Sequence, residues 1–353
     1  MATKTRNRSM SRGTREKARV TIHSVAEAAG VSIGTVSRVI NGEERVRSTT
    51  RERVSTAIDL LGYEADPVAQ SMRRKTTRSV AILAHDIGNP IFASIMSAAQ
   101  RVLQDAGYIV VLSSSNSAGS EATTVRLLGQ RRVDAIIGFF KRENDPATAA
   151  ALSTFGGALV LFDRNMGVEA DMVSTDNAGG IKQATCHLLD LGHRRIALIG
   201  GTAGVLASRE RARGVIDAFK AYGAEPPPQD FFRTQSVDSD YGLRETSRLL
   251  LRKSRPTAII AGSNRTLEGV IAAIRAMRLR IPRDISIVGF DDSPAARVFD
   301  PPVTVIARDV ERMGTTAAEM VLTRLQSGSS LPPQRAFLNT QIILRESCGY
   351  ALD

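Results

Sequence analysis

The sequence has few of the residues that stabilise secreted proteins, and it lacks the long apolar segments of membrane proteins. Among 353 residues there are two cysteines, Cys186 and Cys348, and no tryptophan. Two cysteines so far apart exclude a CxxC motif and a disulfide scaffold, and no apolar run reaches the roughly 20 residues of a membrane helix. Seven Lys or Arg occupy residues 1–19 without a following apolar segment or cleavage site. We therefore expect a reduced, cytoplasmic protein with no membrane association.

Motifs for catalysis and cofactor binding are also lacking. Residues 79–353 contain no GxSxG, HExxH or GxxxxGK[ST] pattern and no Cys/His set with metal-ligand spacing. The glycine-rich turn at 199–204 lacks the GxGxxG spacing of dinucleotide sites, so we interpret it as a strand-to-helix turn. His187 and His193 flank a predicted helix end, where a surface or capping role is usual. The sequence predicts neither an enzyme nor a cofactor.

The net charge of +11 is unevenly distributed along the chain. Residues 1–80 hold sixteen Lys or Arg against eight Asp or Glu, whereas the other 273 residues hold 31 against 28. Charge concentrated in this way is typical of a polyanion-binding module attached to a nearly neutral body. A basic tail that merely aids solubility would give the same count, so the charge alone leaves both interpretations open.

The basic region is predicted to have three segments. Residues 1–19 are polar and aperiodic, which predicts a disordered basic arm. From 20 to 65, apolar residues recur at helical spacing in three groups, the third opening with a capping-box pattern at Thr49-x-x-Glu52 and ending before Gly62. Residues 66–78 then predict a fourth, short helix that runs through basic residues into a linker.

The segment 21–41 has the features of two helices joined by a tight turn. Gly30 supplies the permissive backbone that such a turn needs, and Ser32 can cap the second helix. The polar side of that second helix carries Ile33, Gly34, Ser37, Arg38 and Asn41. A helix of this kind can enter the major groove of DNA. Thr35 and Ser37 are suited to phosphates, and Arg38 to a base edge or a phosphate.

From Ser79 onward, β-rich apolar runs alternate with segments of helical length. The predicted strands are 79–84, 108–112, 133–140, 158–163, 194–200, 257–261, 285–290 and 303–306. The predicted helices are 92–106, 120–131, 178–191, 207–222, 240–253, 265–279 and 309–326. This alternation predicts an α/β fold with parallel sheets, and its length favours two lobes. We expect the N-lobe at about 79–176 and 307–334, and the C-lobe at about 177–306 and 335–350.

Polar side chains follow several of the predicted strands. These are Asp86, Asp163-Arg164, Asp176-Asn177, Ser263-Asn264 and Asp291-Asp292. The carboxyl edge of a parallel sheet is where small ligands bind, and carboxylates, amides and arginines there can hold oxygen-rich groups. Each cluster alone could be a turn or a helix cap, but five of them favour a ligand site.

The segments VTIHSVAEAAGVSIGTVSRVING, TRERVSTAIDLLGYEADPVAQSMR and GFDD resemble the lactose-repressor family of bacterial transcription regulators. The ordered match extends over essentially the whole chain, with Ser24 standing where the family usually has Asp. The resemblance implies a helix-turn-helix headpiece followed by a periplasmic-binding-protein-like effector domain. It also implies a nucleoid-associated repressor that binds double-stranded operator DNA as a homodimer, with a tetramer left open.

The resemblance carries over to individual positions of the headpiece and the hinge. The DNA-binding positions that it implies are Thr21, Ser32, Ile33, Gly34, Thr35, Ser37, Arg38, Asn41, Ala69 and Met72. Residues 67–74 match a hinge helix that enters the minor groove, and Met72 stands where the family places an apolar wedge, generally Leu. An unbranched thioether can still separate a pair of stacked bases. The alternative, that Met72 packs the hinge against its partner, stays open.

The expected effector is a sugar or sugar-like metabolite in the cleft between the lobes. Together with Asp86, the implied effector-binding residues are Ile91, Phe92, Arg164, Asn177, Arg211, Asn264 and Asp291. Arg265 departs from the family, which commonly has Asp there, so a sugar acid or another anion is one interpretation. Pairing of Arg265 with Asp291, or exposure to solvent, are the others. A periplasmic-type solute-binding protein and a sugar- or nucleotide-using enzyme remain the alternative functions.

Overall fold

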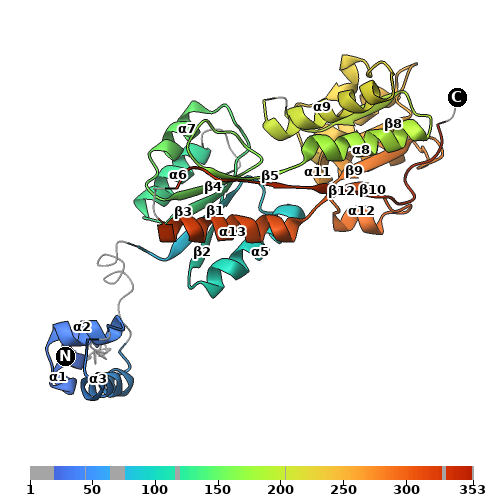
Figure 1. Cartoon of the computed structure of the whole chain (residues 1–353). Coiled ribbons are helices and arrows are strands. Elements are labelled where there is room, and N and C mark those ends of the chain that lie inside the picture. The colour runs from blue at the N-terminus through green and yellow to red at the C-terminus, as the bar shows by residue number, and fades with distance from the viewer. Residues whose placement is uncertain are drawn as a thin grey trace, which may run out of the picture. The chain divides into compact units, whose positions relative to one another are not determined.

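The computed structural model describes residues 20–43, 45–63, 76–115, 120–202, 204–327 and 331–351. The chain divides into two units, Met1–Thr77 and Arg78–Asp353 (Figure 1). The predicted arm at 1–19 and most of the predicted hinge, including Ala69 and Met72, lie outside the described residues.

In its described residues, the first unit contains three helices at the positions that the apolar periodicity predicts. They are α1 (Ile22–Ala29), α2 (Ile33–Ile40) and α3 (Ser48–Leu61), coloured blue in Figure 1. Their apolar faces meet in one core, formed by Val25, Ala26, Ala29, Val36, Val39, Val54 and Ala57. Since small alanines of α1 belong to this core, the helices can approach closely.

Local hydrogen bonds fix the turn between α1 and α2. Gly30 has a φ of 60°, in the left-handed region that glycine adopts without strain. The guanidinium of Arg53 donates from its Nη2 to the carbonyl oxygens of Ala29 (2.6 Å) and Gly30 (3.1 Å). The Thr35 amide donates to the Ser32 hydroxyl (3.2 Å), so Ser32 caps α2 as predicted.

Helices α1 and α3 differ in how their N-termini are capped. At α1, the Thr21 amide donates to the Ser24 hydroxyl (3.4 Å), so serine serves where the family usually has Asp. The predicted capping box at Thr49-x-x-Glu52 is wrong. Helix α3 begins at Ser48, so Thr49 has helical backbone and cannot act as the N-cap, which falls on Arg47.

The second unit contains two six-stranded sheets, in the orders β11-β5-β4-β3-β1-β2 and β12-β10-β9-β8-β6-β7. The first sheet comprises β1 (Ser79–Ala84), β2 (Ile109–Ser114), β3 (Ala135–Phe139), β4 (Ala158–Phe162), β5 (Asp171–Thr175) and β11 (Arg335–Leu338). The second comprises β6 (Ile196–Ile199), β7 (Phe232–Arg233), β8 (Ala258–Ala261), β9 (Ser286–Phe290), β10 (Thr304–Arg308) and β12 (Thr340–Ile343). The pairings are parallel apart from β12 against β10, which confirms the predicted α/β class.

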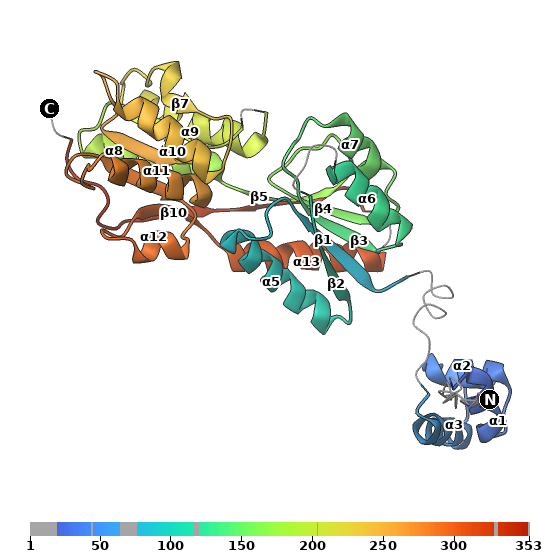
Figure 2. The same cartoon turned by 180° about the vertical axis from the view of Figure 1, so that it is seen from behind.

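Helices cover both faces of each sheet (Figures 1 and 2). The first sheet packs between α5 (Pro90–Asp105) with α13 (Val310–Ser327) and α6 (Ser120–Gln130) with α7 (Pro146–Ser153). The second packs between α8 (Asn177–Asp190) with α9 (Leu206–Ala221) and a layer of α10 (Ser239–Leu250), α11 (Asn264–Ala276) and α12 (Pro294–Val298). A short 3-10 turn, η1, spans Gln229–Phe231. No helix in the described ranges is long and apolar enough to span a bilayer.

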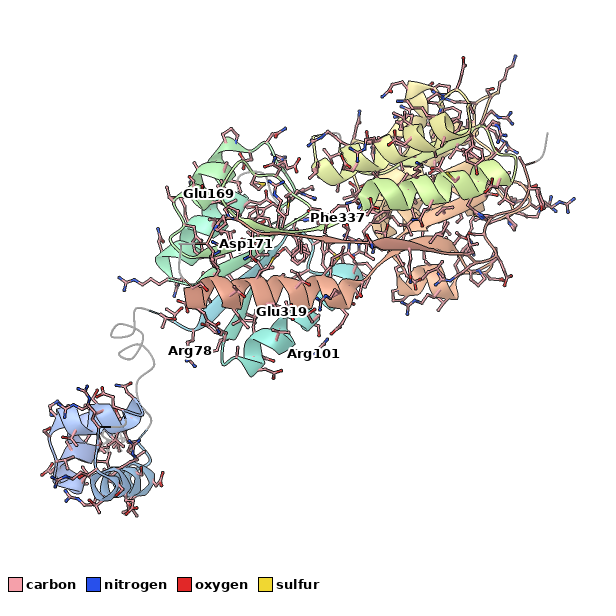
Figure 3. The ribbon with its side chains drawn as sticks, in the orientation of Figure 1. Arg78, Arg101, Glu169, Asp171, Glu319 and Phe337 are labelled. Carbon is pink, nitrogen blue, oxygen red and sulfur yellow. The ribbon has the colours of Figure 1, made fainter. Side chains whose placement is uncertain are left out.

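The chain crosses between the lobes three times, and the last crossing corrects the predicted boundary. The sequence predicts 335–350 in the C-lobe, but β11 pairs in parallel with β5 of the first sheet. The buried carboxylate of Asp171, at the start of β5, explains this position. It accepts from the Gln334 amide (2.7 Å) and pairs with Arg324 of α13, which holds the chain beside β5. Figure 3 labels Asp171 and Phe337 on these two neighbouring strands.

Candidate functional site: the interlobe cavity and helix α2

A cavity of about 590 Å³ lies between the two lobes of the second unit. Much of its wall comes from residues at or just beyond the carboxyl ends of strands in both sheets, where ligands of parallel sheets bind, while Phe92 and Arg211 reach it from helices α5 and α9. The first lobe contributes His85, Asp86, Asn89, Phe92, Phe139, Lys141, Phe162, Asp163 and Arg164. The second contributes, among others, Ser208, Arg211, Asp238, Asn264, Arg265, Asp291 and Arg308.

Six of the eight residues predicted to bind an effector line this cavity. They are Asp86, Phe92, Arg164, Arg211, Asn264 and Asp291. Ile91 instead packs into the core of the first lobe and is 5% exposed. Asn177 is buried behind the wall, where its Oδ1 accepts from Arg211 Nε (2.9 Å) and its amide nitrogen donates to the Thr175 carbonyl (3.1 Å). It therefore positions Arg211.

Arg211 is a buried cation held by neutral partners. Besides the bond to Asn177, its Nη1 donates to the Gly262 carbonyl, and its guanidinium carbon lies 3.8 Å from the centre of the Phe290 ring. It forms no ion pair with a carboxylate of the described residues. Burial, chiefly, together with the nearby Arg308, lowers the pKa of Arg211 to about 10.

Arg308 joins two carboxylates at the point where β10 leads into the first lobe. Its Nε and Nη2 donate to the two oxygens of Asp291 (2.6 and 3.0 Å), and its Nη1 lies 3.4 Å from Asp163 Oδ2. All three side chains are more than nine-tenths buried. Sequence reasoning missed Arg308 because no local pattern connects it with its two acidic partners, which lie 17 and 145 residues away in the sequence.

Further contacts connect the lobes at the edge of the cavity. The amides of Asn89 and Asn264 donate to each other's Oδ1, both at 3.1 Å. Arg265 donates from Nε to Asp86 Oδ2 (3.2 Å) and from Nη2 to the Gly88 carbonyl (2.9 Å), and it also pairs with Glu268 (3.6 Å). The two alternatives for Arg265, pairing with Asp291 and exposure to solvent alone, are therefore wrong.

An aromatic wall forms the first-lobe side of the cavity. The rings of Phe139 and Phe162 stack with centroids 4.2 Å apart, and Phe92 lies 4.9 Å from Phe139. His85 packs edge-on against Phe92 (5.1 Å), and its Nδ1 lies 3.0 Å from the Phe139 carbonyl oxygen. Burial lowers the pKa of His85, and since a carbonyl only accepts, Nδ1 carries the proton of the neutral ring.

His193 corrects our expectation of a surface or capping role. It is 2% exposed, with Nδ1 2.9 Å from the Thr257 hydroxyl and Nε2 3.0 Å from the Gly349 carbonyl oxygen. It lies outside the cavity and anchors the carboxyl-terminal segment. In the ranges that the structure covers, no group of His, Cys, Asp and Glu is arranged to hold a metal ion.

Helix α2 presents most of its predicted polar residues to solvent. Val36 and Val39 are buried against the other two helices. The exposed residues among the predicted contacts are Thr21, Ser32, Ile33, Gly34, Arg38 and Asn41, and Thr35 and Ser37 are half-buried. The Asn41 amide donates to the Ser37 hydroxyl (3.4 Å). The first turn of α2 is therefore free of bulky side chains apart from Ile33, a surface that a DNA groove can approach.

Comparisons with known proteins agree with this architecture. Residues 21–66 match the family described as bacterial regulatory proteins, lacI family, and residues 185–348 match the periplasmic binding protein-like domain. The HTH-type transcriptional regulator CelR of Thermobifida fusca is 33% identical over 337 residues, which cover 93% of this chain and 98% of the relative. The chain belongs to the LacI family. It is a DNA-binding transcriptional regulator and not an enzyme.

Other LacI-family relatives are similar over nearly the same length. The transcriptional repressor PurR of Pectobacterium carotovorum is 33% identical, with 87% of this chain and 91% of the relative covered. A solved complex of CelR with cellobiose has a TM-score of 0.71 at 32% identity and covers 93% of this chain and all of that one. The lac repressor dimer bound to operator and the anti-inducer ONPF has a TM-score of 0.80 at 27% identity, covering 94% and 99%. The predicted family and fold class are confirmed.

Proposed function

We propose that this LacI-family regulator is a cytoplasmic repressor whose affinity for operator DNA is controlled by a small effector bound in the interlobe cavity. The cavity itself carries the proposal. It is lined by polar side chains from both lobes and lies where the chain crosses between them. The structure of CelR with cellobiose supports a sugar-like effector.

The arrangement of the cavity supports coupling between effector and lobes. Arg265 with Asp86, Asn89 with Asn264, and Arg308 with Asp163 all connect the first lobe to the second around the cavity. A ligand that binds between them has different contacts when the lobes move apart. It can therefore shift the balance between lobe arrangements by its difference in affinity for them.

We propose that α2 reads the operator. Arg38 contacts a base edge or a phosphate, Thr35 and Ser37 contact phosphates, and the small Gly34 allows close approach. Thr21, Ser32, Ile33 and Asn41 complete the contact surface on the headpiece. Ala69 and Met72 of the predicted hinge helix, which lie outside the described residues, remain predictions for minor-groove contact.

We also propose that the regulator acts as a homodimer. A headpiece this small contacts few base pairs, so two copies on a near-palindromic site supply the missing specificity. Strand β2 supports this, because it is an edge of its sheet and exposes Ile109 (69%) and Leu112 (54%) to solvent. Apolar side chains on an open sheet edge favour an interface with another chain. The solved lac repressor dimer is a relative with this assembly.

Selection of bound DNA from a randomised pool by the full chain tests the proposal directly. We expect enrichment of one sequence with two related half-sites, followed by loss or gain of binding when a metabolite panel is added. Enrichment of unrelated sequences would contradict the operator-binding role. A selected site whose binding responds to no metabolite would contradict effector control.

A further inference from the structure

One part of the cavity wall, here called its floor, is formed by Asp163, Arg164, Arg211, Asp291 and Arg308. It has few hydrogen-bond acceptors that are not already used by the protein. Both carboxylate oxygens of Asp291 accept hydrogen bonds from Arg308, at 2.6 and 3.0 Å. Asp163 accepts from the Thr175 amide (2.8 Å), the Thr175 hydroxyl (3.1 Å) and Arg308 (3.4 Å). Both carboxylates are therefore largely occupied by the protein itself. A polyol whose hydroxyls must donate to them would compete with these bonds.

Two arginines give the same floor an excess of donors. Arg164 donates from Nε to the Phe140 carbonyl (2.7 Å) and from Nη1 to the Asp163 carbonyl (3.0 Å), so both partners are neutral. Arg211 likewise donates to the neutral oxygens of Asn177 and Gly262. A guanidinium has five N–H groups, and these bonds use two on each residue. Neither arginine forms an ion pair with a carboxylate among the residues that the structure describes.

A buried charge is expensive unless it is paired. Arg211 is 7% exposed, and burial, chiefly, lowers its pKa to about 10, while Asp291 and Asp163 act in the opposite direction from beyond ion-pair distance. Arg308 is the third cation of the floor, and it shares Asp163 and Asp291. The buried carboxylates of Glu143 and Glu121 act on Arg164 only from beyond ion-pair distance. A ligand carboxylate between Arg164 and Arg211 would therefore be the first direct acidic partner of either guanidinium among the described residues.

The other charged side chains of the wall are engaged or lie at its rim. Arg265 sits between Asp86 (3.2 Å) and Glu268 (3.6 Å), so it is already neutralised. Asp238 accepts from the Tyr241 amide (2.7 Å) as the cap of α10 and is exposed. Lys141 and Asp240 are also exposed, and His85 is neutral. Arg265, which stands where the family commonly has Asp, is therefore not the residue that would bind an anion in this cavity.

We propose that the effector is an organic acid whose carboxylate binds Arg164 and Arg211 and whose ring lies against Phe92 and Phe139. A carboxylate only accepts hydrogen bonds and matches the guanidinium fork in shape and charge. The aromatic wall suits the flat carbon face of a pyranose or an aromatic ring equally well. The proposal rests on the proposed function only in that it concerns the same cavity.

Matched pairs of compounds test the proposal on the full chain. Thermal-shift measurements and calorimetry would compare D-glucuronate with D-glucose, D-galacturonate with D-galactose, and 4-hydroxybenzoate with 4-hydroxybenzyl alcohol at millimolar concentration. We expect at least one acid to raise the melting temperature while its neutral counterpart does not. The pair that responds identifies the ring as a sugar or an arene.

Variants separate the anion site from general damage. We expect Arg164→Gln to reduce affinity for the responding acid by about ten- to a hundredfold, since a charged hydrogen-bond partner is lost, and to abolish the preference over the neutral counterpart. Arg211→Lys keeps the charge but loses the fork, so a smaller loss is expected. Arg126→Gln, at an exposed position on α6, is the matched control and should bind like the wild type. Melting curves without ligand show whether each variant folds.

Three results would overturn the proposal. The first is that no acid stabilises the protein, and the second is that the neutral member of every responding pair stabilises it as much as the acid or more. The third is that a folded Arg164→Gln variant still prefers the acid as strongly as the wild type does. Operator binding, measured on the same protein, distinguishes this failure from failure of the proposed function. A protein that binds an acid without any change in operator affinity refutes effector control and keeps the anion site.

Discussion

Asn89 and Asn264 exchange two side-chain hydrogen bonds of 3.1 Å across the cleft between the lobes. Both are nearly buried, at 7% and 2% exposure. Asn89 also caps α5, because its Oδ1 accepts from the Ile91 amide (3.0 Å), and Asn264 is the first residue of α11. The pair therefore ties together the starts of two helices in different lobes. Separating the lobes must break both bonds, whereas movements within one lobe leave them intact.

This relationship predicts that the asparagine pair stabilises lobe closure more than the neighbouring ion pair does. A double-mutant cycle on Asn89→Ala and Asn264→Ala should give a coupling energy of about 1 kcal/mol, measured by urea unfolding. The same cycle on Asp86 and Arg265, whose side chains are about one-third exposed, should give less, because solvent screens the pair. Equal or reversed couplings would mean that Arg265 is the main connection.

We predict that the main role of Asp291 is to stabilise the folded protein. Asp291→Asn should lower the free energy of unfolding by about 3–5 kcal/mol, because it leaves Arg308 buried with a weakened partner. Asn tolerates the positive φ of 74° at this position, so the change tests the charge and not the backbone. Asp230→Asn, which breaks the more exposed pair with Arg252, is the control and should cost less than about 1 kcal/mol. Similar losses in both would contradict the role of Arg308.

Most of the strands that sequence reasoning found are buried on both faces, and the exception is the edge strand β2, which its run of β-branched residues predicted although it is partly exposed. After Ser79, the run VAILA in β1 is apolar because Val80 and Ile82 face α5 and α13 while Ala81 and Leu83 face α6 and α7. Strands β5, β11 and β12 were missed because polar residues interrupt them and they are partly exposed. Strand β5 begins with the buried Asp171, and the ion partner of Asp171, Arg324, is 153 residues away in the sequence. No local pattern contains that pairing.

The sequence predicts those residues of the candidate site that follow the end of a strand. It does not predict residues whose position depends on where a helix begins or on a partner far away in the sequence. Asp86, Arg164 and Asn264 follow strands and line the cavity. Ile91 does not, because capping by Asn89 starts α5 at Pro90 and turns Ile91 toward the sheet. Arg308 was missed because its ion partners lie 17 and 145 residues away in the sequence.

Stability is predicted to fall as pH drops below the ordinary histidine range. Burial lowers the pKa of His193 from 6.5, so the unfolded chain binds more protons there than the folded one. The contribution is complete above pH 6.5 and is lost as pH falls toward the lower, folded-state pKa. His193→Gln should make the pH dependence of unfolding by urea shallower between pH 7.5 and 5. His85, shifted in the same direction, should leave a residual dependence. An unchanged slope in the variant would mean that His193 does not titrate on unfolding.

The proposed dimer predicts an effect of charge on β2. Leu112→Asp should weaken self-association by about 2 kcal/mol or more, the cost of losing a buried leucine at an interface. Because a twofold interface contains the same patch twice, both copies are affected. Sedimentation velocity over a concentration series measures the change. Leu127→Asp on α6, where the leucine is also about half exposed, is the control. Equal weakening by both changes, or by neither, would place the interface elsewhere.

The last prediction concerns the exposed side chain of Arg38 on α2. Arg38→Ala should weaken binding to the selected operator by about 1–3 kcal/mol if the guanidinium hydrogen-bonds a base edge. The loss should then be concentrated on the selected sequence and relax the preference at one base pair of each half-site. If Arg38 contacts only a phosphate, binding to all sequences should weaken equally and the salt dependence should become less steep.

Fluorescence anisotropy with operator and scrambled duplexes, at two or more salt concentrations, distinguishes these outcomes for Arg38. Arg126→Ala removes the same charge from an exposed position of the second unit and should change neither affinity nor salt dependence. Effector binding in the cavity should also be unchanged by Arg38→Ala, because Arg38 belongs to the first unit. Wild-type affinity of Arg38→Ala for every duplex would remove this residue from the DNA interface and leave α2 to act through its serine and threonine hydroxyls.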